Sequence, residues 1–191
     1  MSLFEDSHYQ GIFTKLSLEN ETIESKDFED FEFDGCSFID CKFLKSRFIN
    51  CRFNECNFSL INPLESRFID VTFTKSKVMG FDWTKAKNIQ DLTFDSCQIN
   101  YSNFDLLKIP KTKMVNCEAK EVEFIETDFS NGDFHNTDFE RSRFFKTNLS
   151  EADFRGARNY VIDVKNNILR KARFSLPEAL VLLDSLEILV D

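Results

Sequence analysis

Glycine, proline and tryptophan are scarce in this 191-residue chain, which holds 5, 3 and 1 of them. No run of eighteen apolar residues occurs, so the sequence predicts no membrane-spanning helix. The first ten residues, MSLFEDSHYQ, lack the basic cluster and the apolar stretch of a signal peptide. These absences favour one cytoplasmic domain of unusual construction.

Positive charge is also in deficit. The chain has 24 Lys and Arg against 33 Asp and Glu, which gives a formal net charge of −9. A protein that binds phosphates directly needs a basic face, so we do not expect nucleic acid as a direct partner. A basic or nucleic-acid-binding protein stays open as a partner.

Residues that usually carry catalysis or hold metals are equally sparse. The histidines are His8 and His135, and the sequence places no cysteine or carboxylate at ligand spacing from either. There is no Cys-x-x-Cys pair and no glycine-rich phosphate loop. We therefore expect no metal, no cofactor and no enzymatic activity.

Phenylalanine, by contrast, is abundant and periodic. Large apolar residues recur at every fifth position from Phe13, shift by one extra residue within 85–88, and resume from Ile89 to Phe174. Of the 23 phenylalanines, nineteen occupy this position. The predicted core ladder comprises Phe28, Phe33, Phe38, Phe43, Phe48, Phe53, Phe58, Phe68, Phe73, Phe94, Phe104, Phe124, Phe129, Phe134, Phe139, Phe144 and Phe154.

A five-residue period keeps one face inward on neither a straight helix nor a straight strand, so the chain must turn within every repeat. The residue two before each large one is mostly small and fills a second inward position. All six cysteines occupy that position, which favours buried free thiols over a metal site or a disulfide. The pattern predicts a β-solenoid whose coils stack about 4.8 Å apart.

Units such as Cys36-Ser37-Phe38-Ile39-Asp40 and Ala152-Asp153-Phe154-Arg155-Gly156 resemble the A(D/N)LXX repeat of the pentapeptide-repeat family. The resemblance implies an all-β fold, a right-handed quadrilateral β-helix with four repeats per coil and a short C-terminal α-helix. We expect an N-terminal cap over 1–12, the solenoid over 13–174 with a one-residue frame slip near 84–88, and a C-terminal segment over 175–191. The slip is interpreted as a packing adjustment, with a contact loop as the alternative.

Periodicity alone allows three or four sides, and charge spacing separates them weakly. Outward residues one coil apart are stacked neighbours that favour opposite signs. Between residues 91 and 158, a spacing of twenty gives eight opposite and two like pairs, whereas fifteen gives seven and four. The charges therefore favour four sides and about seven coils.

The C-terminal segment is predicted to be helical. Ser175 and Glu178 form a capping-box pattern around Pro177, and a cap over the last coil would cover its open strand edges. The candidate cap or dimer residues are Leu176, Leu180, Leu183, Leu186 and Leu189. The apolar surplus resembles the tail of the Qnr and MfpA quinolone-resistance proteins and implies a homodimer, with a cap alone as the alternative.

The acidic surface is the remaining functional lead. Residues 1–35 carry a net charge of −8 and residues 121–155 carry −5, separated by a middle of +4. In the Qnr and MfpA group, the resemblance implies a DNA mimic that binds DNA gyrase or topoisomerase IV and lowers quinolone sensitivity. The candidate partner-binding residues are Glu121, Glu123, Glu126, Asp128, Asp133, Asp138, Glu140 and Asp153. The alternatives are a solvating face of cross-coil ion pairs and a scaffold for an unknown partner without DNA mimicry.

Overall fold

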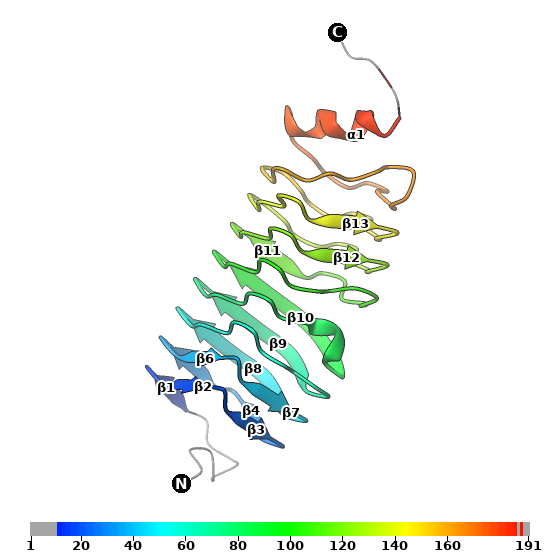
Figure 1. Cartoon of the computed structure of the whole chain (residues 1–191). Coiled ribbons are helices and arrows are strands. Elements are labelled where there is room, and N and C mark those ends of the chain that lie inside the picture. The colour runs from blue at the N-terminus through cyan, green and yellow to red at the C-terminus, as the bar shows by residue number, and fades with distance from the viewer. Residues whose placement is uncertain (1–10, 187, 189–191) are drawn as a thin grey trace.

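The computed structural model describes residues 11–186 and 188. The chain winds into a right-handed quadrilateral β-helix of about seven turns, with β1 near one end of the rod and α1 at the other (Figure 1). Every strand pair is parallel, as expected when consecutive coils of a solenoid stack on one another. No helix in the described ranges is long and apolar enough to cross a bilayer.

Most strands are one repeat side long, and three run across two sides. The strands are β1 (Ile12–Thr14), β2 (Ser17–Glu19), β3 (Thr22–Glu24), β4 (Asp27–Glu29), β5 (Glu32–Asp34), β6 (Ser37–Ile39), β7 (Lys42–Leu44), β8 (Arg47–Asn54), β9 (Arg67–Thr74), β10 (Asn88–Asp95), β11 (Lys113–Val115), β12 (Glu123–Ile125) and β13 (Arg143–Phe145). The helical pieces are η1 (Trp83–Lys85), η2 (Glu178–Leu180) and α1 (Val181–Asp184).

The strand register fixes the number of sides. Phe48 of β8 pairs with Phe68 of β9, twenty residues later, so four repeats complete one coil and a three-sided coil is excluded. Between β9 and β10 the offset is one residue longer, with Phe73 opposite Phe94. The 3-10 helix η1 precedes β10 and takes up the extra length, beginning after Asp82, whose side chain accepts from the Thr84 N–H.

The phenylalanine ladder fills the centre of the coil. All seventeen predicted ladder residues are buried. Most rings one coil apart stack, as in Phe33 over Phe53 with centroids 4.6 Å apart and Phe53 over Phe73 at 4.8 Å. Each fully buried ring contributes about 2 kcal/mol before conformational entropy is subtracted, so this ladder dominates the stability of the fold.

The smaller inward side chains also hold the coils together. Ser66 Oγ donates to the Phe43 carbonyl at 2.7 Å, and Thr127 Oγ1 donates to the Phe104 carbonyl at 2.8 Å. A buried hydroxyl needs such a partner, and the carbonyl of the preceding coil supplies it. The sequence predicted small residues at these positions but not this hydrogen-bonding role.

Most repeats turn through a residue in the left-handed conformation, two positions after the large inward residue. Asn50, Asp70 and Asn131 hold this position with φ of 51°, 53° and 59°. Asparagine and aspartate tolerate this conformation better than other side chains, and glycine tolerates it best. The corner residues thus form four columns along the rod.

The C-terminal end corrects one detail of the sequence prediction. Pro177 precedes η2 without a side-chain cap, so the capping box does not form. Ser175 Oγ instead accepts from the Gly156 N–H of the preceding coil at 2.9 Å. Val181 and Leu182 pack against the core, and among the predicted cap or dimer leucines Leu176, Leu180 and Leu186 are exposed.

Candidate interaction surface

One side of the rod carries β3, β7, η1, β12 and β13, and we call it the β12 face (Figure 1). Parallel pairing links β3 to β7 and β12 to β13, and single bridges join Lys42 to Asn62 and Asn103 to Glu123 between them. Two corner columns border the face. They comprise Asp40, Leu60, Gly80, Tyr101, Glu121 and Arg141 along one edge, and Lys45, Glu65, Lys85, Leu106, Glu126 and Lys146 along the other.

The structure distributes the eight predicted acidic residues over all four sides. Glu121, Glu123 and Glu126 lie together on the β12 face. Asp128 lies on the adjacent side between Lys108 and Asn148. The remaining residues occupy the other two sides, Asp133 and Asp153 on the β11 side and Asp138 and Glu140 on the fourth. The fold thus brings three of the eight together.

Those three carboxylates form a transverse acidic row that is matched by a basic row one coil later. Arg141 lies 3.7 Å from Glu121, Arg143 lies 4.0 Å from Glu123, and Lys146 lies 3.0 Å from Glu126. The three glutamate side chains are 44–45% exposed. Exposed pairs of this kind contribute only about 0.2–1 kcal/mol each, so a competing basic surface could displace them.

Asp138 is the most buried member of the predicted acidic set, with its side chain 7% exposed. Arg158 lies 3.3 Å away, Lys120 lies 3.6 Å away, and Asn159 Nδ2 donates to Asp138 at 2.8 Å. Burial acts to raise the pKa of Asp138, but the hydrogen bonds and the two cations outweigh it and lower that pKa. Asp138 therefore anchors the fold rather than an open binding surface.

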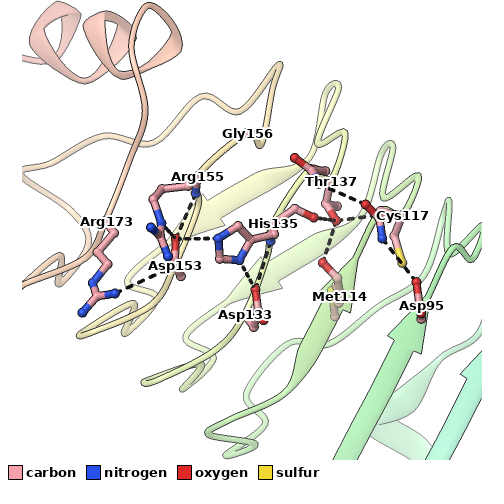
Figure 2. Close-up of polar contacts among 12 residues, drawn as sticks. Asp95, Met114, Cys117, Asp133, His135, Thr137, Asp153, Arg155, Gly156 and Arg173 are labelled. Carbon is pink, nitrogen blue, oxygen red and sulfur yellow. Dashed lines mark hydrogen bonds and ion pairs between the residues drawn. The ribbon is translucent and has the colours of Figure 1, made fainter.

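Asp153 is the centre of a second charged cluster (Figure 2). Arg155 donates to it through Nε at 2.9 Å and Nη2 at 2.7 Å, and Arg173 lies 3.8 Å away. His135 contacts Asp133 through Nδ1 and approaches Asp153 through Nε2 at 3.5 Å, two contacts that the repeat pattern did not predict. The solenoid stacks Asp153 above Asp133 and so creates this contact.

The groove over this cluster has a volume of about 480 Å³. Burial acts to raise the pKa of Asp153, whereas the hydrogen bonds from Arg155 lower it, and the net change is downward. Acidic and basic groups alternate in the groove, which is lined by Asn131, Gly132, Asp133, His135, Glu151, Asp153, Lys171 and Arg173. Within the described residues no group of His, Cys, Asp and Glu is arranged to hold a metal ion.

All six cysteines are buried free thiols. Desolvation raises the pKa of Cys51 and Cys56 to about 12. The thiolate is the reactive form of cysteine, so these side chains belong to the core rather than to a nucleophilic site.

The C-terminal leucines lie on an outward surface. Leu176 is 75% exposed, Leu180 46% and Leu186 41%. Leu183 is partly buried, and Leu189 lies outside the described residues. This surface is distinct from the one formed by Val181 and Leu182, which covers the coil.

Four exposed apolar residues on the β12 face were not singled out from the sequence. They are Leu60, Leu64, Tyr101 and Leu106, with exposures of 58%, 46%, 59% and 68%. For Leu60, Tyr101 and Leu106 the available signal was an apolar residue at a corner position, where the repeat otherwise places polar residues or glycine. We call these four residues the apolar patch.

The arrangement defines a class of protein, a filled β-solenoid whose consecutive coils pair in parallel. The family profile for the pentapeptide repeat region matches residues 26–104 and 46–124 of this chain. The profile for pentapeptide repeats matches residues 120–158. The chain belongs to the pentapeptide repeat family. No curated protein matches it by sequence.

Solved structures show the same fold. A trypsin-treated variant of QnrB1, a plasmid-mediated fluoroquinolone resistance protein, is similar with a TM-score of 0.75 at 18% identity. The match covers 95% of this chain and 97% of that one. Full-length QnrB1 is similar with a TM-score of 0.63 at 14% identity, covering 93% and 100% of the two chains.

Proposed function

We propose that this protein is a non-catalytic binding protein that acts on DNA gyrase or topoisomerase IV by occupying a DNA-binding surface, and that it lowers quinolone sensitivity. The observation that carries the proposal is the similarity in shape to a fluoroquinolone resistance protein along nearly the whole of both chains. A filled coil offers no catalytic cleft, so the activity must reside on the outer surface.

The acidic row of Glu121, Glu123 and Glu126 is the part of the predicted acidic surface best placed for such binding. Its carboxylates share one coil of one face and are held only by exposed ion pairs. A basic DNA-binding groove would replace Arg141, Arg143 and Lys146 as their partner. Charge complementarity of this kind chiefly speeds association and weakens as salt rises.

The test is DNA supercoiling by purified gyrase, and separately by topoisomerase IV, with the protein titrated in the presence and absence of a fluoroquinolone. Inhibition or rescue at stoichiometric concentrations supports the proposal. The variant Glu121→Gln/Glu123→Gln/Glu126→Gln should weaken the effect by at least about tenfold. No effect on either enzyme would overturn the proposal.

The matched control is Arg141→Gln/Arg143→Gln/Lys146→Gln, which breaks the same three ion pairs but keeps the carboxylates. It should retain or strengthen the effect on the enzyme. Equal loss in both triple variants would mean that the pairs serve the fold rather than the partner.

A scaffold without DNA mimicry is the second candidate. It is favoured by the cross-coil pairing of the acids, since five of the eight opposite pairs expected at a spacing of twenty form ion pairs. Partner binding that is insensitive to salt and to the triple glutamate variant would favour it.

We further propose that two copies associate through the exposed C-terminal leucines Leu176, Leu180 and Leu186. Exposed apolar side chains at the end of a capped rod match the homodimer expected from the sequence. Such a dimer would double the length of the rod.

A further inference from the structure

The corner residues of the β12 face differ from those elsewhere on the rod. Leu60, Tyr101 and Leu106 have left-handed backbones, with φ of 59°, 63° and 62°. Every other corner residue with positive φ in the described part of the chain is glycine, polar or charged. The three exceptions all lie on the two edges of this one face.

These three side chains contribute little to the stability of the rod by itself. A large side chain is disfavoured in the left-handed conformation, where asparagine or glycine is tolerated. Burial could offset that strain, yet all three side chains are more than half exposed. Both the backbone strain and the exposed apolar surface therefore favour a role that is fulfilled only when something covers them.

The residues beneath the apolar patch are closely packed. Leu60 lies over Gly80, where an added β-carbon would stand 2.9 Å from Leu60 Cδ2. Phe81 and Trp83 are fully buried in the coil that separates Leu60 from Tyr101. Leu64 lies on the same face, between the two corner columns. From Leu60 to Tyr101 the patch spans two coils, or about 10 Å along the rod.

Acidic groups outnumber basic ones at the border of the patch, where Lys42 and Lys45 lie on the preceding coil and Lys45 is 3.6 Å from Glu24. Glu65 and Asp105 lie within the same three coils and form no ion pair with any described residue, whereas Lys85 is paired with Asp82 at 3.3 Å. The acidic row of Glu121, Glu123 and Glu126 lies on the coil that follows the patch. The basic row that pairs with it lies one coil farther from the patch.

We propose that the apolar patch docks an extended segment of a partner protein that carries apolar side chains flanked by lysine or arginine. In an extended segment of polyproline II conformation, residues three apart lie on the same face about 9 Å apart, which matches the span from Leu60 to Tyr101. The basic flanks of the segment meet Glu65, Asp105 and the acidic row. The inference shares the acidic row with the proposed function but rests on the apolar patch, so either proposal can fail without the other.

The test uses two fluorescently labelled peptides of equal length, with leucine at every third position and either lysine or glutamate elsewhere. Fluorescence anisotropy with the full chain should show the lysine peptide binding at least about tenfold more tightly than the glutamate peptide. The variant Leu60→Asn/Tyr101→Asn/Leu106→Asn should lower the affinity for the lysine peptide by at least about tenfold. Control variants Ile168→Asn and Val161→Asn, at exposed apolar sites away from the patch, should bind like the unaltered protein.

Thermal melting of the triple asparagine variant distinguishes a loss of binding from a loss of stability. The triple asparagine variant should melt at the same temperature as the unaltered protein or higher, because asparagine suits a left-handed corner. A lower melting temperature would assign the three residues to stability and overturn the proposal. Unchanged binding of the lysine peptide in the triple variant, equal affinity for the two peptides, or self-association that the triple variant abolishes would also overturn it.

Discussion

The indole ring of Trp83 lies face to face with the phenyl ring of Phe81, with centroids 3.9 Å apart and planes inclined by 19°. Phe81 occupies an inward position that elsewhere holds mostly small residues, and both side chains are fully buried. Pro63 occupies the large inward position one coil earlier, twenty residues before Trp83. The aromatic pair thus supplies volume next to the one side of the preceding coil where proline stands in place of a larger residue.

Phe81→Ala should lower the free energy of unfolding by about 3–5 kcal/mol, since it leaves a cavity between rigid rings. Trp83→Phe should cost less, under about 2 kcal/mol, because Trp83 Nε1 is buried without a hydrogen-bond partner among the described residues. Urea unfolding followed by circular dichroism measures both. Equal costs would show that Nε1 is hydrogen-bonded in solution.

Substitutions at two glycines should destabilise the fold for different reasons, steric overlap at one and backbone strain at the other. A β-carbon on Gly132 would stand 2.7 Å from the Phe134 ring and 2.9 Å from the Phe129 carbonyl oxygen. Gly35 has φ of +60° and its nearest neighbour would be Lys15 Cγ at 3.6 Å. Gly132→Ala should therefore cost about 1–3 kcal/mol through overpacking, and Gly35→Ala about 1–2 kcal/mol through strain.

A further substitution for each glycine tests whether overlap or backbone strain causes the loss of stability. Gly35→Asn should be milder than Gly35→Ala, since asparagine tolerates the left-handed region. Adding Phe134→Leu to Gly132→Ala should cost less than the sum of the single changes. Additive costs would contradict the predicted overlap with the Phe134 ring.

Asp138 should make the stability of the fold depend on pH. Its pKa is lowered in the folded protein, so its contribution is complete above the unfolded value of about 3.9 and is lost as pH falls through the folded pKa. Asp138→Asn should cost about 1–3 kcal/mol at neutral pH, and the difference from the unaltered protein should vanish in acid. Asp40→Asn, at an exposed corner, serves as the matched control in urea titrations from pH 7 to 2. A difference at Asp138 that persists at the lowest pH would contradict the charge-based explanation.

The proposed homodimer predicts a specific sensitivity at the C-terminus. Leu176→Asp/Leu180→Asp should shift the chain from dimer to monomer in light scattering after size exclusion, because a buried charge opposes an apolar interface. Ile12→Asp, at an equally exposed apolar site of the first coil, should leave the dimer intact. A chain that is monomeric before any substitution would leave α1 as a cap alone.

The role of individual acids was less predictable than the role of the phenylalanines. Asp138 and Glu123 fall in the same position of their repeats, yet one side chain is 7% and the other 44% exposed. Their partners come from neighbouring coils, and Asn159, which donates to Asp138, lies where the repeat becomes irregular. A repeat pattern carries no information about such local departures.

The sequence by itself determined the solenoid and its core, because the five-residue spacing of the phenylalanines fixes which side chains point inward wherever the chain turns. It also located the one-residue shift, which the strand register places between β9 and β10. Only the tertiary structure decided which outward residues share a face, because this depends on the number of sides and on where the extra residue is taken up. The grouping of Glu121 with Glu126, the contacts of His135 with two aspartates, and the apolar patch all follow from that stacking.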